Sequence, residues 1–239
     1  MSGDNAYMRF IVATGIVLCV LLSVKDINAT NTDNLIKNLK SKDFDVRMQA
    51  VETLGNNIDE NTLDVFKKYV FVRTEVWKIK IKAIDFLGAV EDREVSEFLI
   101  KVVGDPLLNQ GCPAIKRHAI VALGKKFNNG SKAVYALVNV LKEDNLLIRE
   151  AAIQSLGAIG DPEAVPYLLQ GLDNKSFAIK LSTIRALEQI GDIQAVPHLE
   201  RFVEKESDPH LKAIAASLVK NSSSWIICTS NKNIKNKHN

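Results

Sequence analysis

A repeat of 31 to 36 residues runs through most of this chain and constrains its fold more than any other feature. Residues 148–168 read IREAAIQSLGAIGDPEAVPYL, and residues 179–199 read IKLSTIRALEQIGDIQAVPHL, at an offset of 31 residues. The same template recurs as VRMQAVETLG from Val46, IKIKAIDFLG from Ile79 and IKRHAIVALG from Ile115, with a degenerate copy, LKAIAASLVK, from Leu211. A period of this length is typical of helical repeats that stack into a solenoid.

The spacing within each copy predicts one buried stripe along a helix. An apolar residue opens the copy, a small residue follows four positions later, and Leu or Val follows eight positions later. Residues at i, i+4 and i+8 share one helix face. Small side chains on that face let a neighbouring helix approach closely. They are Ala50, Ala83, Ala119, Ala152, Thr183 and Ala215.

Start and stop signals agree with this helix. A residue that favours N-caps stands three positions before four copies, namely Asp43, Asn145, Ser176 and Asp208. Glycine follows the leucine in four copies, where we expect the helix to loosen or end; these are Gly55, Gly88, Gly124 and Gly157. The template therefore forms the second helix of a pair.

The first helix of each pair precedes the template. Asp161-Pro162 and Gly191-Asp192 open two such helices, with Asp as the predicted cap, and Pro166 and Pro197 should kink or delay them. Pairs of this length predict six helix pairs between about residues 32 and 220.

The motifs I-R-x-x-A-x-x-x-L-G and G-D-x-x-A-V-P-x-L, as they stand at 148–168, resemble the HEAT-like repeats first named from phycobilin lyase subunits. The resemblance implies an all-α fold, an α-solenoid of about six HEAT-like helix pairs over residues 30–220. It is specific for fold and not for function, because such repeats occur in lyases, hydroxylases and adaptors.

Residues 10–24, FIVATGIVLCVLLSV, carry no charge and lie between Arg9 and Lys25. The run matches the apolar core of a secretory signal, about 7–15 residues, and is shorter than the ~20 residues of a membrane span. We expect residues 1–29 to be a signal cleaved after Ala29 or an uncleaved membrane anchor. A buried N-terminal helix is a third alternative, although it should show polar residues at helical spacing. The predicted location is exported, periplasmic or anchored to the membrane.

The C-terminal tail, residues 221–239, is rich in Asn, Ser and Lys and is predicted to be disordered, with docking of Trp225 on the last helix pair as an alternative. Its lysines account for the chain's whole net charge of +3, so the remainder is balanced. A nucleic-acid-binding domain normally carries a basic face. We therefore expect no nucleic-acid partner.

Signals for catalysis are weak. The histidines are scattered, no His or Cys pair has metal-ligand spacing, and no phosphate-binding loop occurs. We expect no cofactor, no metal and no catalytic residue. Cys112 as a nucleophile activated by His118 is a minor alternative to an inert cysteine. A disulfide between Cys112 and Cys228 is left open, as is the role of the long insertion at 104–113, which we expect to be a plain insertion.

A basic residue stands at the second position of every copy: Arg47, Lys80, Lys116, Arg149, Lys180 and Lys212. This basic column lies at the edge of the buried stripe. We expect it to be structural, with the charged heads pairing with nearby acids or capping a neighbouring repeat. A basic stripe that binds an acidic partner is the alternative.

Positions three and seven should face solvent, and the resemblance implies that the second helices line a concave face. The predicted binding residues are Met48, Glu52, Ile81, Asp85, Arg117, Glu150, Gln154, Leu181 and Arg185. The apolar ones, Met48, Ile81 and Leu181, have packing on adjacent helices as an equal alternative. The predicted function is a non-catalytic scaffold that binds another protein in the cell envelope. The alternatives are an enzyme or enzyme subunit resembling phycobilin lyases, or another HEAT-like oxidoreductase, and a membrane-tethered structural protein.

Overall fold

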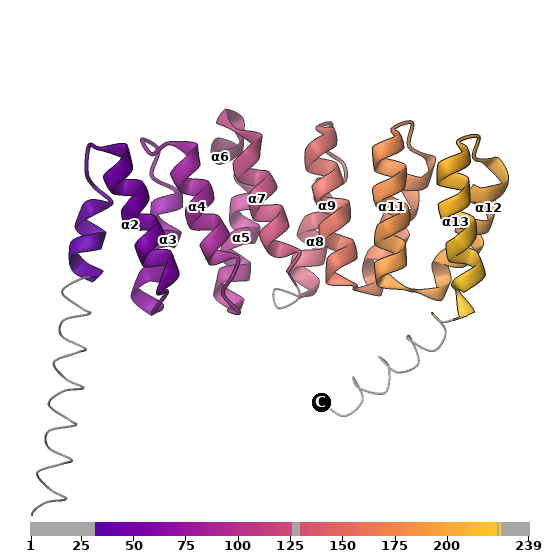
Figure 1. Ribbon diagram of the computed structural model, residues 1–239, viewed down its shortest axis with the longest axis horizontal. Helices are drawn as coiled ribbons and strands as arrows, with labels where there is room; N and C mark the ends of the chain where they lie inside the picture. Colours follow the sequence, from indigo (N-terminus) through magenta and orange to yellow (C-terminus); the bar gives the residue numbers. More distant parts are fainter. Residues whose placement is uncertain (1–31, 126–129, 224, 226–239) are drawn as a thin grey trace, which may run out of the picture. The chain divides into compact units, whose positions relative to one another are not determined.

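The computed structural model describes residues 32–125, 130–223 and 225 (Figure 1), and most of these residues are helical, with no strand among them. The all-α prediction is therefore confirmed. The chain divides into two compact units, residues 1–68 and 69–239. The predicted signal or anchor, residues 1–29, lies outside the described residues.

The first unit contains a helix at residues 32–38, α2 (Phe44–Asn56) and the beginning of α3 (Glu60–Val70). The carboxylate of Asp43 accepts hydrogen bonds from the backbone N–H groups of Asp45 and Val46, so the predicted N-cap of α2 is present. Ala50 and Leu54 of the template are buried. This confirms the stripe that the spacing predicted.

In the second unit, the second helices lie side by side in chain order, and each contacts the next (Figure 1). They are α4 (Trp77–Leu87), α7 (Pro113–Leu123), α9 (Leu146–Ile159), α11 (Phe177–Ile190) and α13 (Pro209–Asn221). A first helix precedes each of the last four second helices. It is α5 (Arg93–Gly104) before α7 and α8 (Ser131–Val140) before α9. Before α11 it is the segment made of η2 (Pro162–Ala164), α10 (Val165–Leu168) and η3 (Leu169–Asp173), and before α13 it is η4 (Ile193–Ala195) with α12 (Val196–Lys205). Each of these packs on the second helix that follows it. With the helix at 32–38 before α2, and α3 before α4, the described residues contain the six predicted pairs.

The small-residue column is buried in every copy of the template. Its members are between 0 and 1% exposed, namely Ala50, Ala83, Ala119, Ala152, Thr183 and Ala215. Burial of the whole column confirms the predicted stripe, and in α11 the column packs on the first helix of its own pair, because Thr183 lies against Gly171 of η3.

The expectation that glycine ends each second helix is only partly correct. Gly88 and Gly124 do end α4 and α7, but Gly157 lies inside α9, which ends at Gly160, and Gly55 lies inside α2. The shared reason for glycine in the second unit is contact between repeats. A Cβ atom at Gly124, for example, would lie 2.7 Å from the side chain of Ser155. Helix packing therefore explains this column better than helix termination does.

The caps are largely as predicted. Asn145 and Asp208 accept backbone hydrogen bonds at the starts of α9 and α13, and Asp161 and Asp192 do so at η2 and η4. Ser176 differs, because its side chain makes no cap bond to α11. Pro166 and Pro197 stand in the first turns of α10 and α12, each preceded by a 3₁₀ turn, which confirms that these helices are delayed.

The chain after α13 turns back on the array. Trp225 is 8% exposed, and its ring lies 3.8 Å from the position that a Cβ atom would take at Gly191, the residue that ends α11. Trp225, for which docking on the last helix pair was the alternative, lies against the end of α11. Residues 226–239, including Cys228, lie outside the described residues.

Candidate functional site

The predicted binding residues at positions three and seven divide into three groups by exposure. Glu52, Asp85, Arg117, Gln154 and Arg185 are exposed, whereas Met48, Glu150 and Leu181 are half-buried. Ile81 is only 9% exposed and belongs to the core. For Ile81 the packing alternative holds, because a residue without an exposed side chain cannot line an open surface.

Two acids on this face link neighbouring helices. Oδ1 of Asp85 on α4 lies 2.7 Å from Nδ1 of His118 on α7, and Oε1 of Glu150 on α9 accepts a hydrogen bond of 3.0 Å from Ser182 on α11. The other two charged residues on this face of the second unit, Arg117 and Arg185, are basic, so acidic and basic residues alternate from α4 to α11. The surface is mixed in charge and is partly committed to contacts between repeats.

Three of the six residues of the basic column make contacts with backbone carbonyl groups or carboxylates. Arg47 donates to the carbonyl oxygens of Ser41 and Lys42, while Lys116 and Lys180 form ion pairs with Glu143 and Glu206. Lys80 is 6% exposed, and Lys212 is exposed. The structural interpretation therefore fits Arg47, Lys116 and Lys180.

The insertion at 104–113 forms a short helix, α6 (Pro106–Gly111), and borders a pocket of about 600 Å³. Asp105 accepts from the N–H of Leu108 and so opens this helix. The pocket, here called the insertion pocket, lies between α6 and the first turns of α4 and α7. It is lined by Phe71, Arg73, Glu75, Val76, Trp77, Lys80, Asp105, Leu107, Leu108, Cys112 and Ile115.

Large apolar side chains are exposed around this pocket. Trp77 is 47% exposed, Val76 41%, Phe71 38% and Leu107 64%. Exposed apolar groups are common one at a time, but a cluster around a hollow indicates an interaction site. The repeat pattern does not single out these residues, because they precede the template or lie in the insertion. The available signal was the unusual width of the third repeat, combined with a tryptophan in a chain that has only two.

The insertion pocket is also lined by a buried base, Lys80. Burial lowers the pKa of the Lys80 amine, and the nearby Glu75 carboxylate opposes that shift. Glu75 also accepts a hydrogen bond from the hydroxyl of Tyr69. The pocket thus combines an apolar rim with a base and an acid that face the same space.

The catalytic alternative at Cys112 gains no geometric support. Cys112 is half-buried at the start of α7 and lines the insertion pocket, but His118 pairs with Asp85. In residues 32–125, 130–223 and 225, no group of three His, Cys, Asp or Glu side chains is placed to hold a metal ion. Within the same ranges, no helix has the length and apolarity that a membrane span requires, and residues 10–24 lie outside them.

Solved structures with similar folds are repeat proteins. An archaeal HEAT-like repeats protein from Thermococcus onnurineus NA1 matches with a TM-score of 0.54 at 16% identity, covering 88% of this chain and 93% of that one. A designed armadillo repeat protein in complex with the peptide (KR)4 matches with a TM-score of 0.54 at 15% identity, covering 78% and 97%. The complex of CpcE and CpcF of phycocyanin lyase from Nostoc sp. PCC7120 matches with a TM-score of 0.50 at 21% identity, covering 77% and 74%. At these identities the likeness concerns the fold alone.

Sequence comparison identifies the family. The search of curated proteins found no match. The family described as HEAT repeats, in contrast, matches residues 32–107, 106–179 and 160–220, which together span nearly all the described residues. This chain therefore belongs to the HEAT repeat family.

Proposed function

We propose that this HEAT repeat protein is a non-catalytic scaffold that binds another protein, and that the insertion pocket receives an apolar side chain of that partner. The carrying observation is the cluster of exposed apolar residues around the pocket, with Trp77 at the first turn of α4 and Leu107 on α6. Aromatic side chains at the centre of an interface commonly carry most of its binding energy. The fold supports the proposal, since a similar designed repeat protein has been solved with a bound peptide.

The charges below the rim fit a protein ligand as well. Lys80 and Glu75 face the pocket and can meet backbone carbonyl and N–H groups of an inserted segment. An apolar centre with a few polar groups is the usual composition of a specific protein interface. Positions three and seven, with Arg117 and Arg185, are the alternative binding surface.

The test is affinity capture with a C-terminally tagged full-length chain from the native membrane and soluble fractions, followed by mass spectrometry. We expect one stoichiometric partner that is lost with Trp77→Ser and with Leu107→Asp. Tyr135→Ser is the matched control, because Tyr135 is 69% exposed on α8 and does not line the pocket. A partner that survives both pocket changes but is lost with Arg117→Glu and Arg185→Glu would place binding on positions three and seven instead.

We also propose that the protein works outside the cytoplasm or at a membrane. The uncharged run at residues 10–24 between Arg9 and Lys25 supports this location. N-terminal sequencing of the mature chain tests it: a start after Ala29 means a cleaved signal, and an intact start in the membrane fraction means an anchor. An intact chain in the cytoplasmic fraction would contradict the proposal.

The lyase-like alternative rests on a likeness of fold alone. It predicts that the native complex carries a tetrapyrrole pigment. Visible absorbance of the captured complex is therefore the measurement that decides it.

A further inference from the structure

Two repeats of the second unit neutralise their column base with an internal carboxylate. Nζ of Lys116 lies 2.5 Å from Oε1 of Glu143, and Nζ of Lys180 lies 2.5 Å from Oε2 of Glu206. Both acids occupy the same place in the repeat, two residues before the N-cap of the following second helix. In these two repeats the same position, here called the slot, therefore places a carboxylate against the base.

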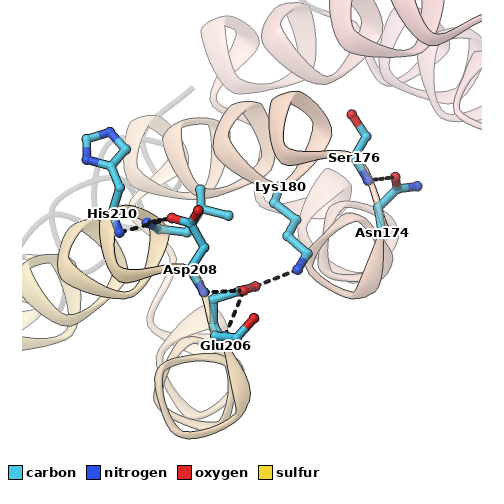
Figure 2. Close-up of polar contacts among 8 residues, drawn as sticks. Asn174, Ser176, Lys180, Glu206, Asp208 and His210 are labelled. Carbon is cyan, nitrogen blue, oxygen red and sulfur yellow. Dashed lines mark hydrogen bonds and ion pairs between the residues drawn. The ribbon is translucent and has the colours of Figure 1, made fainter.

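Figure 2 shows this slot filled by Glu206. Its Oε2 accepts from Lys180, and its Oε1 accepts from the backbone N–H groups of Ser207 and Asp208, each at 2.9 Å. The side chain is 5% exposed, and these hydrogen bonds, the one from Asp208 foremost, lower the pKa of its carboxyl group. One carboxylate thus orders the loop and compensates the base.

The repeat between these two has an amide in the same place. Asn174 stands two residues before Ser176, and its Oδ1 accepts from the N–H of Ser176 at 2.9 Å (Figure 2). The amide reproduces the loop contact, but it carries no charge. The base of this repeat, Arg149, forms no ion pair with any described residue, and its buried Nε has no hydrogen-bond partner there.

Arg149 and Asn174 line a common pocket of about 210 Å³ between α9, α10, η3 and the start of α11. Tyr167 and Gln170 are exposed and line it too, and most of the remaining wall is aliphatic. No acidic residue lines it. A buried guanidinium N–H group without a hydrogen-bond partner is costly, because it has lost water and gained no acceptor.

We propose that this Arg149 pocket binds the side-chain carboxylate of an Asp or Glu residue of the protein partner. The inference rests on the proposed scaffold function and names the chemistry of the partner. The ligand takes the place that Glu143 and Glu206 occupy in the neighbouring repeats. The planar guanidinium of Arg149 matches a carboxylate with two parallel hydrogen bonds, and the hydroxyl of Tyr167 and the amide of Gln170 supply further donors. The aliphatic wall suits the methylene stem of the acid.

The site can be tested without knowing the partner, using propionate as the probe. Two-dimensional ¹H–¹⁵N NMR of the full-length chain follows the Nε–H signal of Arg149, which is assigned by its disappearance in Arg149→Lys. We expect a saturable shift of this signal with sodium propionate and none with propionamide or with sodium chloride at equal ionic strength. Phosphate should bind more weakly than propionate.

A second variant separates binding from folding. Asn174→Glu supplies the internal carboxylate that the two neighbouring repeats have. It should move the Arg149 signal without ligand, raise the thermal stability and weaken propionate binding about tenfold or more, the scale of a lost charge-assisted hydrogen bond.

Several results would overturn the inference: no shift with propionate, an equal shift with propionamide or chloride, tighter binding of phosphate, or undiminished binding in Asn174→Glu. Because the experiment uses propionate and a single signal, its outcome is independent of partner capture at the insertion pocket. Loss of the partner with Trp77→Ser and failure of propionate to bind would refute the acidic ligand alone.

Discussion

Gly157 of α9 packs so closely on Ala186 of α11 that a Cβ atom at position 157 would lie 2.7 Å from the Cα atom of Ala186. The same positions meet one and two repeats earlier, where Gly124 faces Ser155 and Gly88 faces Ala122. Glycine ten positions into the template therefore sets how closely consecutive second helices of the second unit can approach. Contacts of this kind are made between residues about one repeat apart.

Gly157→Ala should lower the free energy of unfolding by about 1–3 kcal/mol, the usual cost of overpacking a well-filled core. The backbone of α11 is the obstacle, so a side-chain rearrangement cannot relieve it. Urea unfolding followed by circular dichroism measures the change. Gly104→Ala is the control, because nothing lies within 4 Å of a Cβ atom at that position. Equal effects of the two changes would contradict the packing argument.

Glu206→Gln should lower stability at pH 7 by about 1–2 kcal/mol, because charge-assisted hydrogen bonds to Lys180 and the loop are lost. The pKa of Glu206 is lower in the folded chain than its ordinary value, so its contribution is complete above pH 4.5 and disappears as the pH falls through the folded pKa. The two stability curves should therefore converge in acid. Glu204→Gln removes the same charge from an exposed position and should stay near wild type at pH 7. Parallel curves down to low pH would refute this role of Glu206.

Lys80→Met should show the opposite pH dependence. Burial lowers the pKa of Lys80, so the charged amine disfavours the folded state at neutral pH, and this penalty disappears as the pH rises toward the ordinary value of 10.5. We expect the variant to gain stability relative to wild type at pH 7 and to lose that relative gain by about pH 10.5. Thermal unfolding between these two pH values measures it. A difference that does not change with pH would show that Lys80 acts by packing alone.

Trp225→Ala should cost about 2–4 kcal/mol, because it removes a large buried side chain from its contact at the end of α11. Denaturant unfolding of the full-length chain measures the loss. Tyr135→Ala removes an aromatic ring that is 69% exposed and should change stability by less than about 0.5 kcal/mol. If the two changes have the same small effect, Trp225 contributes nothing to the fold.

The sequence by itself determined the helices of this protein. The i, i+4, i+8 stripe and the caps at Asp43, Asn145 and Asp208 are local signals, because each depends on residues within about two helical turns. The period of 31 to 36 residues then repeats these signals along the chain. The family resemblance rested on the same residues, so it predicted the fold and left the function open.

Only the tertiary structure decided the contacts and the burial that involve residues about one repeat apart. Ile81 became core, Gly157 became a close contact and Trp225 became buried because other helices lie against them. The insertion pocket exists because α6 stands over the first turns of α4 and α7. Arg149 and Lys180 stand at equivalent positions in the sequence. In the structure Lys180 meets the carboxylate of Glu206, whereas Asn174 takes the equivalent place beside Arg149 and supplies no charge. An ion pair needs two side chains that meet in space. Helical periodicity specifies where the base lies on its helix, but it does not specify which side chain lies opposite that base.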